Sequence, residues 1–207
     1  ANGKAIVLDL RGNPGGRMEA VQVIGQYFLE KGTLMVVKSR MNNSRNEIHT
    51  VLEPDRAFKK TENGDFGFSW WSNIRRQPLI VPPSMPIVVI VDNNSASAAE
   101  ILAGMLQVND RAVIVGKTTL GKGVGQTVIP LPFDRNIHVT SFEFLPGGLA
   151  MDGIGIIPDI EVESPPNRFA ANNDPQLEAA RQVASDAIKK AEELQDKNIL
   201  DECPEGK

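Results

Sequence analysis

The sequence predicts an α/β domain in which helices flank a mainly parallel sheet. The nearly continuous apolar runs KAIVLDL (residues 4–10) and IVVIVD (87–92) are typical of strands that are buried on both faces. Each run is followed by a turn rich in glycine or serine and then by apolar residues at helical spacing. Strands that alternate with helices indicate a parallel sheet, and 207 residues suit one domain.

The expected elements follow one another along the whole chain. They are strands at 4–10, 33–39, 47–53, 87–92 and 112–115, helices at 17–30 and 98–108, two paired strands at 125–131 and 136–144, and a last helix from 175. Asp174 is the expected N-cap of the last helix, because Pro175 suits its first position. We therefore expect a folded core over 1–165 and a linker with a C-terminal helix over 166–207.

One segment, about 40–84, interrupts this alternation and is expected to be an insert or lid. Its residues 54–84 lack a clear period and look like a long loop. Four aromatic residues gather there and either pack the insert onto the body or line a substrate groove or subunit contact: Phe66, Phe68, Trp70 and Trp71.

Composition and charge exclude several classes of protein. A net charge of −4 offers no bulk attraction for nucleic acid or an anionic membrane, and no apolar run has the length of a transmembrane helix. The single cysteine, Cys203, excludes an internal disulfide. The first residues show no signal-peptide pattern and enter a strand almost at once, as though the chain were cut from a longer precursor.

The stretch GKTTLGKGVGQ (116–126) resembles a phosphate-binding loop but departs from it chemically. Such a loop needs Ser or Thr after its lysine, then a helix, to bind magnesium and phosphate. Here Gly123 follows Lys122, and the next residues favour a strand. The alternative frame, which ends at Thr118, has Arg111 where glycine is required. We therefore expect Lys122 to serve other chemistry, or to be a solvated loop lysine.

Ser97 begins the helix that follows the 87–92 strand, where it is either an N-cap or a nucleophile. In open parallel sheets, sites form where strands lead into helices, and the free N–H groups of that helix can hold an oxyanion. A serine nucleophile needs a base. The two histidines, His49 and His138, lie in expected strands rather than strand-end turns, so a Ser-His-Asp triad lacks support. Lys122 can replace a histidine, because burial favours the neutral amine.

Five motifs occur in an order that closely resembles the C-terminal processing peptidases, also called tail-specific proteases. The resemblance covers nearly the whole chain outside 40–84 and the last residues. The motifs are DLRGNPGG (9–16), NNSASAAEILAGMLQ (93–107), GKTTLGKGVGQ (116–126), GIGIIPDIEV (153–162) and DPQLEAA (174–180).

This resemblance implies a ClpP/crotonase-like fold, a Ser-Lys dyad and an acyl-enzyme mechanism, with no cofactor and no metal. The nucleophile, the second serine of a Ser-Ala-Ser-Ala-Ser-Glu pattern, corresponds to Ser97. The base, the lysine of a Phe-Gly-Lys-Gly pattern, corresponds to Lys122, and a supporting glutamine to Gln126. The oxyanion would be held by backbone amides of Ala98 and of Gly15 or Gly16, a choice that the resemblance leaves open.

Two residues depart from the family pattern near the expected site. Ala99 replaces the third serine, and Lys117 stands where an acidic residue is common. A cation at Lys117 is expected to favour neutral Lys122 by like-charge repulsion.

The resemblance also implies partners and a location. Family enzymes carry a PDZ domain and a strand-helix unit ahead of the DLR strand, and this chain contains neither, so we expect a catalytic-core fragment. We expect an exposed sheet edge and weak activity of this chain on its own. We also expect it to pair with the missing part or with a second copy. The substrate would be a polypeptide with an apolar C-terminal tail, outside the cytoplasm and most plausibly in the periplasm. Two alternatives are a non-catalytic peptide-binding relative on this fold and a crotonase-like acyl-CoA enzyme.

Overall fold

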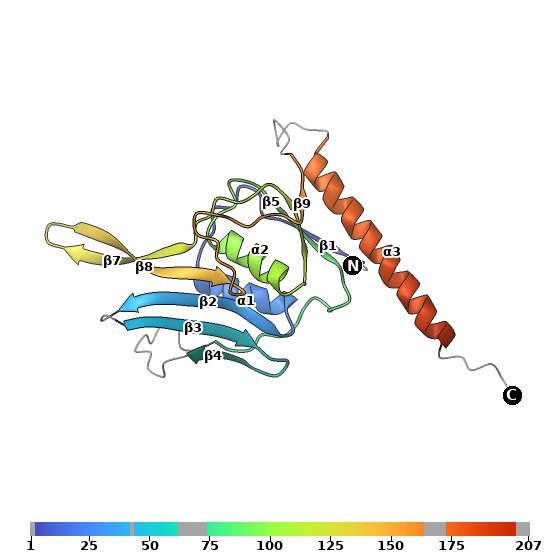
Figure 1. Ribbon diagram of the computed structural model, residues 1–207, viewed down its shortest axis with the longest axis horizontal. Coiled ribbons are helices and arrows are strands. Elements are labelled where there is room, and N and C mark those ends of the chain that lie inside the picture. The colour runs from blue at the N-terminus through green and yellow to red at the C-terminus, as the bar shows by residue number, and fades with distance from the viewer. Residues whose placement is uncertain (1–2, 42–43, 62–73, 164–172, 202–207) are drawn as a thin grey trace.

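The computed structural model describes residues 3–41, 44–61, 74–163 and 173–201, arranged in two sheets and three helices (Figure 1). In chain order these are β1 (Ile6–Asp9), α1 (Met18–Phe28), β2 (Gly32–Met41), β3 (Ser44–Leu52), β4 (Ala57–Thr61), β5 (Ile87–Val91), α2 (Ala98–Val108), β6 (Val113–Gly116), β7 (Val124–Leu131), β8 (Arg135–Pro146), β9 (Ile160–Glu161) and α3 (Pro175–Asp201).

The first sheet is parallel and confirms the predicted fold class. Its strand order is β1-β5-β6-β9, with Val7 opposite Val88 and Val89 opposite Ile114. All five residues of β5 are buried, which explains why its sequence is uniformly apolar. β1 ends the sheet on one side, and no other strand of the described residues pairs with its outer edge.

The second sheet is antiparallel, with strand order β4-β3-β2-β8-β7. The sequence predicts a mainly parallel sheet, and this five-stranded antiparallel sheet is present in addition to it. Residues 57–61, within the segment expected to be a loop, form β4 and pair with β3. The aromatic residues between 62 and 73, the linker over 164–172 and Cys203 lie outside the described residues.

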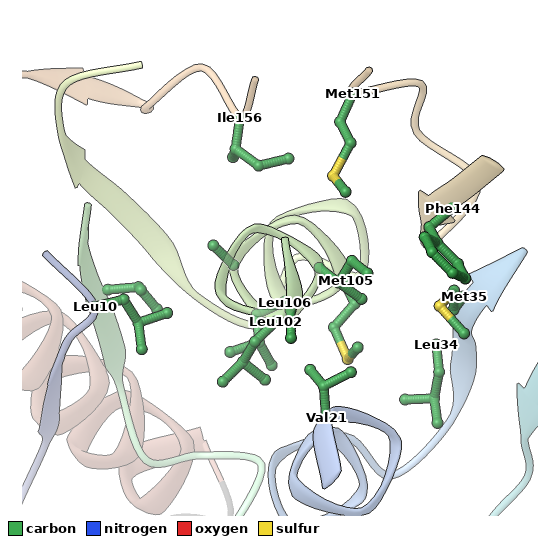
Figure 2. Packing of buried hydrophobic residues seen from close by; sticks show 14 of the residues in the cluster. Leu10, Val21, Leu34, Met35, Leu102, Met105, Leu106, Phe144, Met151 and Ile156 are labelled. Atoms are coloured by element: carbon green, nitrogen blue, oxygen red, sulfur yellow. The ribbon is translucent and has the colours of Figure 1, made fainter. Parts of the chain in front are cut away.

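The main core lies between the two sheets, where α2 packs against α1, β2, β6 and β8. Apolar residues cover the length of α2, and Figure 2 shows Leu102, Met105 and Leu106 among the side chains packed around it. In the same view Val21 projects from α1 toward Met105, and Phe144 lies on the side of the antiparallel sheet. All-round burial explains why α2 carries only two polar residues, Glu100 and Gln107.

α3 covers the opposite face of the parallel sheet. Alternate β5 residues Val88 and Ile90 form a second apolar cluster with Ala180 and Ala184 of α3. Asp174 caps this helix as predicted, since its Oδ1 accepts a hydrogen bond of 3.1 Å from the Leu177 N–H. The parallel sheet is therefore covered on both faces. The turns that follow β1, β5 and β6 lie together at the carboxyl ends of these strands.

Candidate active site

The turn between β5 and α2 places Ser97 at the N-terminus of α2. Ser95 is buried and its Oγ donates to the Leu10 carbonyl over 2.8 Å, which fixes this turn against the end of β1. Ser97 has φ 55° and ψ −118°, a conformation that is costly for a residue with a Cβ atom. Such strain is concentrated at functional sites, and here it falls on the predicted nucleophile.

Glu100 connects Ser97 to the loop that carries Lys122. Its side chain is fully buried one turn into α2, and its Oε2 accepts backbone N–H groups of Ser97 (2.7 Å) and Lys122 (2.9 Å). Its Oε1 accepts the Thr119 hydroxyl (2.5 Å) and the Gly121 N–H (2.6 Å). One buried carboxylate thus satisfies donors from both segments, which sets the distance between their backbones.

A second loop, over 151–156, locks the Lys122 loop from the other side. Asp152 Oδ1 accepts the Gly123 N–H over 3.0 Å, and Gly121 accepts the Gly153 N–H over 2.9 Å. The amides of residues 121, 122 and 123 therefore all donate to carboxylates. Gly155 has φ +84°, and a Cβ atom there would overlap the Thr119 carbonyl oxygen. The two loops approach this closely only because Gly121, Gly123 and Gly155 lack a Cβ atom.

The turn after β1 brings two glycines to the N-terminus of α2. The Ala96 N–H donates to the Asn13 carbonyl over 2.9 Å. Gly15 has φ +98°, and a Cβ atom there would lie 2.8 Å from the Ala98 nitrogen. The Gly15 N–H donates to Asn13 Oδ1 over 2.9 Å, whereas a Cβ atom at Gly16 would meet open space. Ala98 is the first residue of α2, where an N–H has no partner within the helix.

A cavity of about 430 Å³ opens at this junction. Its polar lining includes Ser97, Lys122 and Gln126, which are the three predicted side chains of the dyad and its support. Its apolar lining is Met18, Val124, Phe142 and Phe144, and its remaining lining residues are Gly16, Glu19 and Gly125. The three predicted side chains and Gly16 thus line one cavity, whereas Ala98 and Gly15 are not among its lining residues.

The environment of Lys122 differs from the apolar turn that the sequence suggested. Ser97 is half-buried, whereas Lys122 and Gln126 are exposed. The expected effect of Lys117 on Lys122 is not supported, because Lys117 Nζ binds Glu161 (2.9 Å) and Glu163 (2.6 Å). Hydrogen bonds to Glu163 and Glu161 raise the pKa of Lys117. Its charge is therefore offset by two carboxylates, which removes the basis for repulsion of Lys122.

Sequence reasoning missed Glu100 and Asp152, which hold the site together. The spacing Ser97-x-x-Glu100 fits a capping box, and that signal could have identified the contact between Glu100 and the Ser97 N–H. No local pattern indicates the contacts of Glu100 with residues 119–122, or those of Asp152 with Gly123. These depend on the tertiary approach of segments 19 to 29 positions apart.

The described residues provide neither a metal site nor a membrane-spanning helix. In that part of the chain, no group of three or more His, Cys, Asp or Glu side chains is placed to hold a metal ion. None of the helices described is both long and apolar enough to cross a membrane.

Comparison with known proteins identifies the family of the chain. Residues 1–162 match the model of peptidase family S41. A carboxy-terminal-processing protease of Bartonella bacilliformis is 36% identical over 163 residues, which is 78% of this chain and 32% of that protein. A carboxyl-terminal-processing protease of Synechocystis is 32% identical over 186 residues, covering 88% of this chain and 37% of that protein. The chain thus spans about a third of the length of these relatives.

Solved structures extend the likeness to the fold. The photosystem II D1 C-terminal processing protease superposes with a TM-score of 0.55 at 25% identity, over 77% of this chain and 35% of that one. Mature CPAF superposes with a TM-score of 0.58 over 92% of this chain and 45% of that one; at 18% identity this supports the fold alone. With the family match over residues 1–162 and the sequence relatives above, the chain belongs to peptidase family S41.

Proposed function

We propose that this chain is the catalytic core of a serine endopeptidase that cleaves polypeptides near their C-terminal tails through Ser97 and Lys122. One observation carries the proposal: both side chains line the same cavity, and Glu100 binds the backbone of both residues. A histidine base is disfavoured, because His49 and His138 lie on β3 and β8 and neither lines this cavity.

The proposed reaction has two steps. Ser97 Oγ attacks the scissile carbonyl carbon while the neutral amine of Lys122 accepts the hydroxyl proton. The resulting tetrahedral oxyanion collapses, the C–N bond breaks, and the Lys122 ammonium returns the proton to the departing amine. A water molecule then attacks the Ser97 ester in the same way, giving a carboxylic acid and free Ser97.

Backbone amides of Ala98 and Gly16 are the proposed oxyanion donors. The Ala98 N–H belongs to the first turn of α2, whose dipole favours negative charge at that end. Gly16 is favoured over Gly15, because the Gly15 amide already donates to Asn13 Oδ1. Loss of one such donor typically costs about 3 kcal/mol of transition-state stabilisation.

Gln126 is proposed to orient Lys122 across the cavity that both line. A bound polypeptide would cover the exposed Lys122 amine and exclude water, which favours proton transfer between neutral groups. The apolar side chains of Met18, Phe142 and Phe144 suit an apolar residue of the substrate tail. We also infer that the protein acts outside the cytoplasm, as its resemblance to tail-specific proteases implies; fractionation of the source cells tests this.

A serine-reactive acylating probe tests the dyad directly. We expect mass spectrometry to find the probe on Ser97, and expect labelling to disappear in Ser97→Ala and fall at least 100-fold in Lys122→Ala. Ser141→Ala and Lys117→Ala are the matched controls and should label at the wild-type rate. Undiminished labelling in folded Lys122→Ala, or a label on another serine, would refute the proposal.

A further inference from the structure

We propose that the hairpin arm formed by β7 and β8, residues 124–141, binds the polypeptide substrate as an additional β-strand along the free edge of β7. The occupant is an extended, apolar and uncharged stretch of chain. This inference rests on the proposed function and deepens it, because it assigns a surface that captures substrate outside the cavity.

The arm projects from the body of the molecule (Figure 1). β8 continues into the antiparallel sheet beside β2, but β7 is the last strand of that sheet, and no other strand that the structure describes pairs with its outer edge. An edge strand presents unpaired N–H and C=O groups that can pair with another chain. Addition of a peptide to such an edge is a recurring mode of peptide recognition.

The root of the arm is part of the cavity itself. Val124, Gly125 and Gln126 are the first three residues of β7, and all three line the cavity with Ser97. The Phe144 N–H donates to the Gly123 carbonyl over 2.7 Å and fixes the point where the arm leaves the body. A peptide paired along β7 is therefore led directly to the predicted nucleophile.

The side chains of the arm are apolar where solvent would normally select charge. Cross-strand register places Ile129 opposite Ile137 and Thr127 opposite Val139 on one face, while Val128 lies on the other face and is 51% exposed. Phe133 at the tip is 85% exposed.

β7 carries no charged residue, and in the whole arm only Asp134 and Arg135, both at the tip, carry a full charge at neutral pH. Natural proteins usually protect exposed edges with lysine, charge or a short strand. This edge is eight residues long and uncharged, and it is interrupted only by Pro130 and by the irregularity between Gly125 and Gln126. An unprotected apolar edge indicates a binding surface, and the absence of charge selects an apolar partner.

Continuity with the cavity favours substrate over a second copy of the chain. A copy paired to β7 would occupy the edge that leads to Ser97, and would compete with the polypeptide for residues 124–126. A substrate needs the same edge and the cavity at once.

Binding to an inactive variant tests this inference without any need for turnover. In a Ser97→Ala background, we would measure the affinity for a fluorescently labelled, unfolded polypeptide with an apolar C-terminal tail. The double variant Val128→Lys/Ile129→Lys should weaken binding at least 10-fold. Ile80→Lys and Leu194→Lys are the controls, because both residues are exposed to a similar degree away from the arm. Affinity unchanged in the double variant would overturn the inference.

A second measurement examines the backbone pairing. Methylation of successive amide nitrogens in the polypeptide should weaken binding at every second position, because alternate N–H groups of a strand face the same edge. A uniform effect, or none, would contradict strand addition. Loss of a dimer in the arm variant, with polypeptide affinity unchanged, would show that the occupant is a second copy and would also overturn the inference.

A third measurement separates this inference from the proposed function. With Ser97 intact, the arm variant should keep the wild-type rate of labelling by the small acylating probe while KM for the long polypeptide rises at least 10-fold. Failure of the wild-type protein to label would refute the dyad alone. Normal labelling with an unchanged KM in the arm variant would refute the arm alone.

Discussion

The loop over 116–123 and the arm over 124–141 are neighbours in sequence but differ in almost every physical respect. In the loop, three successive amides donate to the carboxylates of Glu100 and Asp152, and Gly121 and Gly123 are buried. In the arm, β7 is exposed from Gln126 onward and packs mainly against β8. Within a few residues the chain thus passes from a buried, hydrogen-bonded loop to an exposed edge strand.

This contrast separates two tasks that a peptidase must perform. A base and a nucleophile must be held within a fraction of an ångström, which requires buried and fully paired backbone. Capture of varied polypeptides requires accessible backbone and tolerant apolar contacts. We therefore expect substitutions in the loop to change stability and chemistry together, and substitutions in the arm to change substrate affinity alone.

The largest effect should come from Gly155→Ala, which breaks the contact between the two glycine loops. A methyl group at this position would overlap the Thr119 carbonyl, and φ +84° is unfavourable for alanine. We expect the free energy of unfolding to fall by about 4 kcal/mol, from overpacking and backbone strain combined. Chemical denaturation measures this change.

Gly153→Ala is the control for backbone strain, because its φ is +69° but nothing lies within 4 Å of the new methyl group. It should lose only about 1 kcal/mol. Equal losses in the two variants would show that close approach of the loops contributes nothing.

Glu100→Gln should have the next largest effect. Each oxygen of the Glu100 carboxylate accepts two donors. A glutamine has only one acceptor oxygen, so at least two of these four donors lose their partner. Two unsatisfied buried donors are expected to cost about 3 kcal/mol. Labelling of Ser97 should also slow at least 10-fold at a temperature where the variant is folded, because the two backbones are no longer held together.

The exposed Glu178→Gln is the control and should change neither stability nor labelling. A destabilised Glu100→Gln that labels at the wild-type rate would limit Glu100 to a structural role.

A smaller effect is expected from the backbone strain at Ser97. Ser97→Gly and Ser97→Ala both remove the hydroxyl, but only glycine relaxes φ 55° and ψ −118°. We expect the glycine variant to be more stable than the alanine variant by about 1 kcal/mol. Thermal unfolding of the two proteins compares them directly, and an alanine variant as stable as the glycine variant would remove the case for strain.

The smallest effect should come from Lys117, which belongs to the same loop but whose side chain forms surface ion pairs. The pKa of Lys117 is raised, so the stabilisation is present below the ordinary value of 10.5 and is lost as pH rises through the higher folded value. Lys117→Gln should lower Tm slightly at pH 7 in low salt, and not in 1 M NaCl (Debye length about 3 Å). A shifted pH profile of Ser97 labelling in this variant would restore the idea that Lys117 acts on Lys122.

Much of the fold follows from local sequence patterns. The helix expected at 98–108 has those bounds in the structure, because an apolar periodicity and an N-cap serine mark it. The buried strand at 87–91 was equally clear from its uninterrupted apolar residues. That Ser97 and Lys122 line the same cavity is predicted only by the family resemblance, since no local sequence pattern links the two residues.

The rest depends on contacts that are distant in sequence. β4 was missed because Phe58-Lys59-Lys60 alternates weakly, and its pairing with β3 decides its conformation. The paired strands over 125–131 and 136–144 were predicted, but no sequence pattern distinguishes a hairpin packed on the body from one that projects. The exposure of Lys122 was likewise unpredictable, because it depends on what covers the cavity.

The ion pair between Arg11 and Asp174, 2.8 Å long, has a consequence for how the chain folds. It ties the first strand to a helix that lies beyond residue 162, where the match to the family ends. Contacts of this kind join residues 163 positions apart, which raises the contact order and is expected to slow folding. A protein trimmed to residues 1–162 would leave Val88, Ile90 and Val115 without their cover, and should self-associate during synthesis rather than reach a monomeric native state.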